Sequence, residues 1–509
     1  SHWSTMGFYA RLNWNYNNIY FLEFSGRYDG SSRFAAGHRW GFFPSFSAGY
    51  DIARTPYFQK MALPVSQLKV RVSYGRLGNQ NGAGLYDYIA QMPLDAQGTN
   101  AWLLPGISSS TASKGTIAQT PKMISPYITW EKVDNANLGF DLMLFKNRLS
   151  ITADLYQRTT RDMIGPAESI PSISGIASED RAKVNNATLR NRGWELSVSW
   201  NDKLKCGFSY GVGFNVFNYK AVVTKYNNPE GIIYNNHTGL AANKGYYEGM
   251  DLGEIWGYRA DDLFLSNREI DDYLRKVDLT AFKSNDLWRR GDLKYIDTNG
   301  DGRVDGGKGT LSDHGDLQVI GNTTPKYSFG INLNLGYKGF EVSTLLQGVA
   351  KRDFPIAGSN YMFGGNNYNF KEHLDYFSTE NPNGYLPRLT GWKDDKDFLV
   401  NTGYNTTRYL LNAAYMRMKN LTVAYTFNKK QLKHIGISNL KVYVTCDNLF
   451  TITKLPKQFD PETLNQVNMS AGGDAKNTAP GLTSPMKQNG NGMVYPMNRN
   501  FVFGLDFTF

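Results

Sequence analysis

The sequence has little of what marks a helical membrane protein or a disulfide-stabilised one. Its 509 residues contain no run of about 18 apolar residues, which excludes a transmembrane helix. The only cysteines are Cys206 and Cys446, so no disulfide framework is expected, and both are interpreted as unpaired thiols. The segment from Ser1 to Thr5 lacks the features of a signal peptide, and a strand pattern follows within a few residues. We therefore expect the chain to start within a fold.

Catalytic signatures are also missing. The 6 His residues are scattered singly, without the HExxH or paired spacing of a zinc site. The sequence has no GxSxG nucleophile elbow and no phosphate-binding P-loop. Carboxylate pairs such as Asp394-Asp395 lie in expected loops, where solvated acids are commoner than a glycosidase pair. We therefore expect no enzymatic activity.

The charge of the chain does not indicate a nucleic-acid partner. The net charge is +10 and the pI is about 9.2, which would suit a nucleic-acid-binding protein. The Lys and Arg residues are dispersed, however, without a basic helix or a recognisable nucleic-acid-binding module. We expect no binding of nucleic acid.

The chain is rich in aromatic residues and glycine. Phe, Tyr and Trp make up 14% of it, and 51 residues are Gly. This composition favours short strands joined by turns. The mean hydropathy of -0.45 does not exclude a membrane, because lipid-facing apolar residues of a transmembrane barrel alternate with polar residues that face the lumen.

Apolar and polar residues alternate along many segments, which is the pattern of a strand with two different faces. At the end of the chain Phe501, Phe503, Leu505, Phe507 and Phe509 fall on one face. The pattern recurs in segments 8–16, 20–27, 46–52, 68–74, 138–142, 149–155, 194–200, 208–216, 327–335, 340–346, 421–427 and 440–444. We therefore predict about thirteen antiparallel strands.

Short and long connections separate the predicted strands. Tight turns are predicted at Asn17-Asn18, Lys146-Asn147, Asn201-Asp202 and Lys338-Gly339. Long irregular segments are predicted at residues 77–130, 222–322, 350–410 and 452–497. Transmembrane barrels have short periplasmic turns and long extracellular loops, so we expect the long segments outside the cell, where a ligand or partner is met. A soluble β-propeller fits less well, because no repeat of about 40 to 50 residues is found.

Several motifs resemble the SusC/RagA group of TonB-dependent outer-membrane transporters. They are Arg27-Tyr28-Asp29-Gly30-Ser31-Ser32-Arg33-Phe34, Arg39-Trp40-Gly41-Phe42-Phe43-Pro44-Ser45, Ile320-Gly321-Asn322 followed by Pro325, Asp447-Asn448-Leu449-Phe450, Asp460-Pro461-Glu462 and the terminal aromatic strand ending in Phe509. Together they extend over essentially the whole chain. The resemblance implies an all-β fold, in which residues 1–509 form the C-terminal portion of a transmembrane antiparallel β-barrel of about 22 strands.

The resemblance also implies parts that this chain does not contain. Members of the group carry an N-terminal plug domain and a TonB box, and the predicted strand count is well below that of their barrels. We expect the plug and the first strands to come from another polypeptide or segment. The resemblance further implies TonB and a SusD-like surface lipoprotein as partners, an oligosaccharide or peptide as ligand, and surrounding outer-membrane lipid.

A calcium loop is predicted between residues 297 and 305. Oxygen ligands are expected at alternate positions along it, from Asp297, Asn299, Asp301, Arg303 (through its backbone carbonyl) and Asp305, and glycine stands where an EF-hand-type loop turns sharply. The twelfth position, where an EF-hand has a bidentate Glu, is Lys308, so we expect Asp316 to close the site, with Asp313 as the alternative. An Asx-rich turn without metal is the competing interpretation. The calcium, Ca2+, would be structural.

Ligand contacts are predicted from loop composition alone. The segment 364–369 and the aromatic residues around it offer amide hydrogen bonds and ring stacking to a sugar or a peptide. The candidates are Tyr361, Asn366, Asn367 and Trp392, with Trp256 as a further aromatic residue. Packing within the loops is the competing interpretation for each of them.

The functional hypothesis is TonB-dependent import of a nutrient through a barrel closed by a plug. In this mechanism the ligand is trapped between the lipoprotein lid and the barrel, and displacement of the plug releases it inward. Two alternatives remain at this stage. A passive porin requires an even number of strands that closes without another chain. A secreted glycan-binding β-protein requires solubility without detergent.

Overall fold

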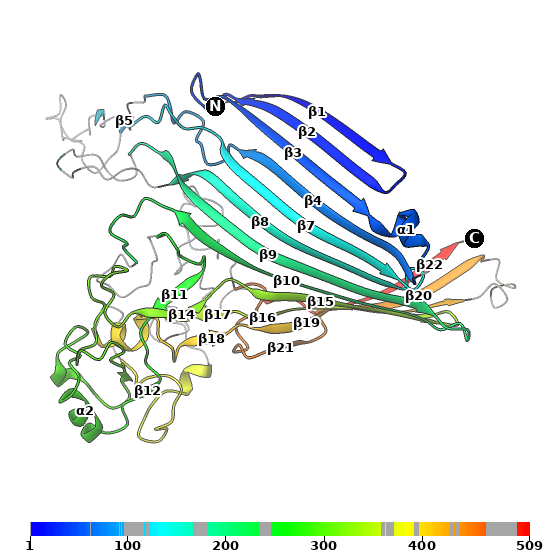
Figure 1. Cartoon of the computed structure of the whole chain (residues 1–509). Coiled ribbons are helices and arrows are strands. Elements are labelled where there is room, and N and C mark those ends of the chain that lie inside the picture. Colours follow the sequence, from blue (N-terminus) through cyan, green and yellow to red (C-terminus); the bar gives the residue numbers. More distant parts are fainter. Residues whose placement is uncertain are drawn as a thin grey trace, which may run out of the picture.

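The structure is a computed structural model of the chain. It describes residues 2–61, 63–90, 92, 94–95, 117–118, 123–165, 171, 173, 181–233, 246–357, 362, 371–390, 396–427, 432, 437–464 and 496–508. The largest part of the fold is a single 14-stranded antiparallel sheet that curves into a wall (Figure 1). None of the described helices is long and apolar enough to cross a membrane.

The wall follows the chain, because almost every strand pairs with the one before it and the one after it. Its order is β1-β2-β3-β4-β7-β8-β9-β10-β15-β16-β19-β20-β22, and β21 pairs beside β20 with β19. The bounds are β1 (Thr5–Tyr16), β2 (Tyr20–Ser31), β3 (Trp40–Asp51), β4 (Val65–Asn79), β7 (Glu131–Leu144), β8 (Leu149–Gly165), β9 (Val184–Lys203), β10 (Ser209–Lys225), β15 (Lys326–Tyr337), β16 (Phe340–Lys351), β19 (Tyr415–Phe427), β20 (Asn439–Asp447), β21 (Thr451–Thr453) and β22 (Asn500–Thr508). Each strand predicted from the alternation is found, and the all-β fold class is confirmed.

Three of the predicted tight turns join neighbouring strands where expected. Asn17 and Asn18 have φ angles of 51° and 55°, Lys146 and Asn147 have 60° and 66°, and Lys338 has 46° before Gly339 at 92°. Asn and Gly adopt this left-handed conformation at low cost, and it matches the twist of a hairpin.

The fourth turn, predicted at Asn201-Asp202, was wrong. Both residues lie inside β9, where Asn201 pairs with Gly211 and Asp202 pairs with Tyr210. The chain reverses after Lys203 instead, and Gly207 supplies the left-handed φ angle of 88° that the turn requires. Two turn-forming residue types at 201 and 202 were therefore overridden by the continuing ladder of hydrogen bonds.

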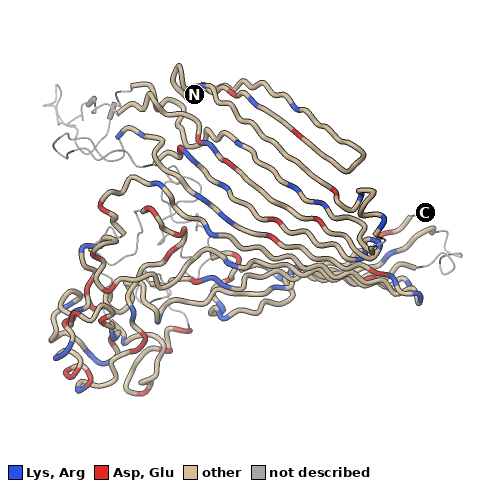
Figure 2. The backbone as a smooth tube through the Cα atoms, in the orientation of Figure 1, with Lys and Arg blue, Asp and Glu red and all other residues tan. Residues whose placement is uncertain are grey.

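The two faces of the wall differ in chemistry, because paired residues in adjacent strands share a face. One row runs Asn137, Tyr156 and Gly193, and a neighbouring row on the opposite face runs Leu138, Leu155 and Trp194. The first face is polar. Figure 2 shows the charged positions spaced along the strands. The second face is apolar and still open, since Phe503 is 78% exposed and Leu12 is 69% exposed. An apolar surface of this extent belongs against hydrocarbon rather than water.

The terminal strand β22 is part of the lipid-facing surface. Phe501, Phe503, Leu505 and Phe507 are 55%, 78%, 66% and 52% exposed, respectively, and none of them packs inside a compact core. Burial of this row in a water-soluble core would have contradicted the barrel interpretation. The placement of these rings excludes that arrangement.

The connections divide into a short-turn end and a long-loop end. The hairpin turns lie at one end, together with η1 (Ile52–Arg54) and the short helix α1 (Pro56–Gln59), which Thr55 caps by accepting a hydrogen bond from the Phe58 amide. Because the strands are antiparallel, the four long segments predicted as loops all leave from the opposite end. This is the arrangement of an outer-membrane barrel, with its long loops outside the cell.

Much of the long-loop end is folded, where the sequence indicated only irregular segments. Short strand pairs and short helices occur there. They are β5 (Leu94–Asp95), β6 (Ile117–Ala118), β11 (Glu254–Gly257), β12 (Asp262–Leu263), α2 (Asn267–Leu274), η4 (Asn285–Leu287), β13 (Leu293–Lys294), β14 (Gln318–Asn322), β17 (Asp353–Pro355), η5 (Lys371–Leu374), α3 (Lys396–Phe398), η6 (Leu399–Gly403) and β18 (Leu410–Asn412). These elements cover only part of residues 222–322 and 350–410, so the prediction of irregular segments holds for most of the described residues there.

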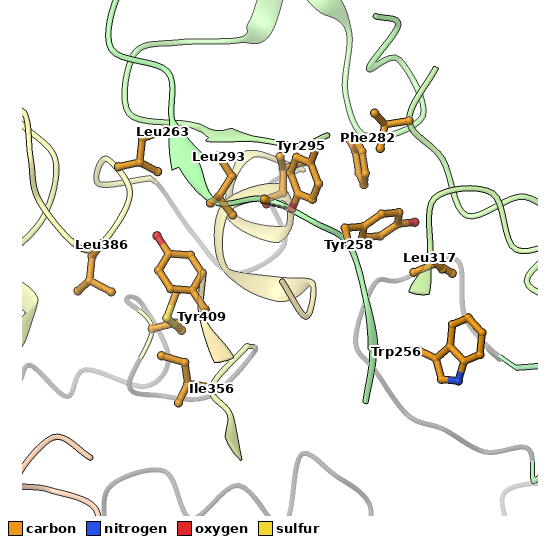
Figure 3. Packing of buried hydrophobic residues seen from close by; sticks show 14 of the residues in the cluster. Trp256, Tyr258, Leu263, Phe282, Leu293, Tyr295, Leu317, Ile356, Leu386 and Tyr409 are labelled. Atoms are coloured by element: carbon orange, nitrogen blue, oxygen red, sulfur yellow. Dashed lines mark hydrogen bonds between the residues drawn. The ribbon is translucent and has the colours of Figure 1, made fainter. Parts of the chain in front are cut away.

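The largest hydrophobic core of the described chain lies in this external region, not in the wall. Figure 3 shows Tyr258, Phe282 and Tyr295 side by side, with ring centroids 5.1 Å apart for the first pair and 4.3 Å apart for the second. Tyr404, from the other long loop, packs edge-on against all three. Two loops far apart in the sequence therefore form one folded unit, which we call the loop domain (residues 246–325, 352–357, 371–390, 396–414 and 454–464).

Candidate functional sites

The predicted calcium loop folds around its own backbone amides. The Asp297 carboxylate accepts hydrogen bonds from the amides of Gly300 at 2.6 Å and Gly302 at 2.8 Å. The Asp301 carboxylate accepts one from the amide of Arg303 at 2.9 Å. Gly300 and Gly302 have φ angles of 78° and 82°, the left-handed conformation that glycine adopts at little cost.

Asp316 closes this loop and Asp313 does not. The Asp316 carboxylate is almost completely buried and accepts hydrogen bonds from the amides of Thr298 at 2.6 Å and Asp305 at 3.0 Å, at the two ends of the loop. Asp313 lies 3.5 Å from the ammonium group of Lys308 instead. Asp316 thus bonds both ends of the predicted loop, while Asp313 pairs outside it.

The donor set of the loop suits a hard cation. Asp297, Asp301 and Asp316 form no ion pair among the described residues, while Asp305 pairs with Arg303 at 3.0 Å. Carboxylate and amide oxygens with excess negative charge are what Ca2+ requires. Among the described residues the carboxylates bond to amides, and no group of three or more His, Cys, Asp or Glu side chains is gathered as metal ligands. The calcium assignment stays a prediction.

The predicted ligand contacts cannot be placed in the fold. Tyr361, Asn366, Asn367 and Trp392 all lie outside the described residues. Trp256 is described, and its indole is buried in the loop domain, where its N–H donates to the Tyr247 hydroxyl at 3.2 Å. The interpretation of Trp256 as a stacking surface was therefore wrong, because its ring already packs against Tyr247 and His314.

A buried ion cluster, which sequence reasoning missed, joins the two halves of the loop domain. Lys283 and Asp292 have fully buried side chains, and their charged groups are 2.7 Å apart. Lys283 also contacts Asp397 at 2.6 Å, while Arg388 bridges Asp292 at 2.6 Å and Asp397 at 2.5 Å. Burial alone would raise the pKa of Asp397, but the hydrogen bonds from Lys283 and Arg388 outweigh it and hold that pKa below its ordinary value.

A second buried ion cluster joins the Asp460-Pro461-Glu462 motif to the wall strand β19. Arg417 in β19 donates to Asp460 at 2.7 Å and to Glu462 at 2.8 Å, and its side chain is almost fully buried. Burial would raise the pKa of Asp460, but the Arg417 hydrogen bond and two backbone amides lower it below its ordinary value. The motif therefore anchors the segment after β21 to the wall.

Other motifs that carry the family resemblance also hold the long-loop end together. Phe34 is buried against Trp130, with ring centroids 5.3 Å apart. Gly321 lies where a side chain would come within 2.8 Å of Leu410 Cδ2. Their burial explains these residues by packing, so the motifs identify the fold and not a ligand.

The polar face of the wall carries cross-strand ion pairs. Arg71 in β4 lies 2.7 Å from Asp141 in β7 and 3.3 Å from Asp154 in β8. Such side chains fit a water-filled lumen, since unpaired charges are costly in hydrocarbon. A wall with one aqueous face and one lipid face defines the protein as part of a transmembrane β-barrel.

The chain belongs to the family described as "TonB dependent receptor-like, beta-barrel", which matches residues 3–449. Similar proteins include TonB-dependent receptor P3 of Formosa agariphila, 25% identical over 98% of this chain and 45% of the relative. TonB-dependent receptor SusC of Bacteroides thetaiotaomicron is 24% identical over 91% of this chain and 42% of the relative. The resemblance to the SusC/RagA group is thus confirmed, and the protein is an outer-membrane protein.

Solved structures show the same fold. The structure entitled "Structure of the RagAB peptide transporter" superposes with a TM-score of 0.69 at 22% identity, covering 100% of this chain and 48% of that one. The "open-open" state of the RagAB peptide importer gives a TM-score of 0.67 at 21% identity, covering 100% of this chain and 47% of that one. The chain spans about half the length of the relatives it matches.

Proposed function

We propose that this chain is the C-terminal wall of an importer that takes up a nutrient across the outer membrane and is powered through TonB. The observation that carries the proposal is the open sheet of a TonB-dependent receptor-like barrel. Within the described residues β1 pairs only with β2, and β22 pairs only with β20. Unpaired strand edges are costly in lipid, so further strands must complete the barrel.

Closure by further strands also favours an importer over the two alternatives. A passive porin made of this chain alone would need β1 and β22 to pair with each other, and they do not. A secreted glycan-binding protein would have to expose the apolar face of the wall to water. We propose that the missing strands and a plug domain are contributed by another segment or chain.

The energy source is tested by uptake in cells that carry the whole transporter. Uptake of oligosaccharides and of peptides is measured with TonB present, with TonB deleted, and after the proton gradient is collapsed. Loss of uptake in both treatments is the expected result. Uptake that continues without TonB would show a passive pore. Depletion of oligosaccharides from the medium would support an oligosaccharide ligand, and depletion of peptides would support a peptide ligand. The name of the RagAB peptide transporter supports the peptide.

We further propose that a SusD-like lipoprotein docks on the loop domain and closes the extracellular mouth. The loop domain supports this because it is a folded, ion-paired platform rather than a set of separate loops. Affinity purification of the whole transporter from membranes should recover the lipoprotein in equal amount. Recovery of the transporter alone under mild detergent would contradict the docking proposal and leave the energy coupling untouched.

A further inference from the structure

On five adjacent strands the lipid-facing apolar residues give way to basic residues as the strand approaches the long-loop end. In β9 the outward positions run Trp200, Val198, Leu196 and Trp194, and the next two toward the outside are Arg192 and Arg190. The outward positions with a positive charge are Arg76 in β4, Lys132 in β7, Arg161 in β8, Arg190 and Arg192 in β9, and Lys220 in β10. We call these six residues the basic belt.

The register places the basic belt on the lipid side and not on the lumen side. Lys220 pairs with Arg192, and Arg192 pairs with Gln157. Gln157 pairs with Ala136, and Ala136 pairs with Tyr74, which lies on the apolar face. One step farther out, Arg190 pairs with Thr159, in the row that contains Arg76 and Asp134. Figure 2 shows Lys and Arg positions toward the left-hand ends of these strands.

The carboxylates of the same surface do not balance this charge. Asp134 forms ion pairs with Arg76 at 2.7 Å and with Arg161 at 3.2 Å, and Asp162 forms one with Lys132 at 2.8 Å. Among the described residues, six cations therefore face two carboxylates, which leaves a charge of +4 (6 - 2). Arg192 donates to the neutral Gln157 at 2.6 Å. Arg190 and Lys220 form no ion pair with any described residue.

Other lipid-facing parts of the wall differ at comparable positions. On β1 to β3 the outward residues toward the long-loop end are aromatic, and Tyr28 stacks on Trp40 with ring centroids 5.0 Å apart. At the short-turn end Arg148 is neutralised by Asp202 at 3.2 Å. Among the described wall strands, the uncompensated charge thus lies at the outer rim of β4 to β10. A cluster of this kind at headgroup level attracts anionic lipid.

We propose that the basic belt binds the phosphate groups of a phosphoglycolipid of the lipid A type in the outer leaflet. The guanidinium groups fit phosphate oxygens through paired hydrogen bonds, and the apolar rows beneath them take the acyl chains. The bound lipid would cover the outer rim of β4 to β10. This inference is independent of the imported nutrient and of TonB.

The test uses the whole transporter in a neutral detergent, titrated with diphosphoryl lipid A and followed by native mass spectrometry. Each cation near an anionic lipid surface contributes about fivefold in binding. The variant R190Q/R192Q/K220Q should therefore bind diphosphoryl lipid A at least about tenfold more weakly.

The variant R190K/R192K keeps the charge and should retain most of the binding. The matched control is Arg158→Gln, because Arg158 lies on the same strand as Arg161 but in a lumen-facing row, and this control should bind like the wild type.

Three results would overturn the proposal. The triple variant and the wild type could bind equally, the wild type could bind fully dephosphorylated lipid A as tightly as the diphosphoryl form, or millimolar inorganic phosphate could displace the lipid and reveal a plain anion site. A folding defect in the triple variant is separated from a binding defect by K220Q alone. Lys220 is exposed and unpaired among the described residues, so this variant should fold and lose about fivefold in binding.

Discussion

At Lys283 an ammonium group is fully buried between two carboxylates and over an indole ring. Its nitrogen lies 4.6 Å from the ring centroid of Trp288 as well as in contact with Asp292 and Asp397. A buried charge is tolerated only when it is paired and hydrogen-bonded, and here Asn401 completes the bonding of Asp292 at 2.9 Å. The residues that define this cluster extend from position 283 to 401, so no local pattern could have revealed it.

Removal of one partner should therefore loosen the loop domain. Lys283→Met leaves two carboxylates with one guanidinium, and we expect a loss of about 3 kcal/mol in the free energy of opening of this domain. Native-state hydrogen exchange of the loop domain in the detergent-solubilised transporter measures it. The double variant K283M/D397N removes one charge of each sign and should recover part of the loss. An unchanged exchange rate in K283M would contradict the assigned role.

The same cluster predicts acid sensitivity. The pKa of Asp397 in the folded protein is lowered, so its contribution to stability is present above the ordinary carboxyl pKa of about 4 and is lost as the pH falls through the lower, folded value. The pKa of Asp460 is also lowered, so its contribution to stability depends on pH in the same direction. Proteolysis of the external loops should therefore accelerate below about pH 4 and stay constant between about pH 5 and pH 8. Faster cleavage at pH 8 than at pH 6 would contradict this direction of the pH dependence.

The calcium loop allows a matched pair of variants. We expect about one calcium per chain by inductively coupled plasma analysis of the purified transporter, because the loop offers hard oxygen donors and excess negative charge. D297N/D301N should lose the metal. Asp313→Asn is the control and should retain it, since Asp313 contacts Lys308 and not the loop. A metal-free wild-type protein would refute the assignment and leave the loop as a set of Asx turns.

At the scale of elements, sequence reasoning located the wall better than the loops. Every wall strand has two chemically different faces, so a period of two is visible in each segment without any knowledge of its neighbours. The loop domain has no such signal, because Tyr258, Phe282 and Tyr404 become a core only when distant segments meet. Asp316 could be proposed from the sequence because it lies close to the loop whose two ends it bonds.

One close approach between elements can be tested directly. Gly257 in β11 lies where an added Cβ would clash with the Asn405 carbonyl oxygen and lie 2.6 Å from Ile320 Cδ1. Because the first of these atoms is backbone, Gly257→Ala should destabilise the loop domain by about 2 kcal/mol. Gly213→Ala in β10 is the control, since its nearest atom would be 3.6 Å away. Thermal unfolding of the loop domain compares them, and equal melting temperatures would contradict the packing.

At the scale of the whole molecule, the two edge strands of the sheet determine whether the chain can close into a barrel alone. All twelve residues of β1 are exposed and its outer edge has no described partner, as Figure 1 shows for the strand at the top of the wall. The edge beyond β22 is equally open. The polar lumen face and the apolar lipid face are thus both present, but a sealed pore requires strands that bridge β22 to β1.

Refolding in detergent tests this dependence. The chain alone should give no heat-resistant band on a denaturing gel, because its unpaired edges leave backbone groups without hydrogen bonds in the micelle. The complete transporter should give a compact band that shifts only on boiling, and so should the chain refolded with the missing strands. If the chain alone formed a heat-resistant closed barrel, the proposal that other strands complete it would have to be abandoned. The passive-pore alternative would then account better for the same wall.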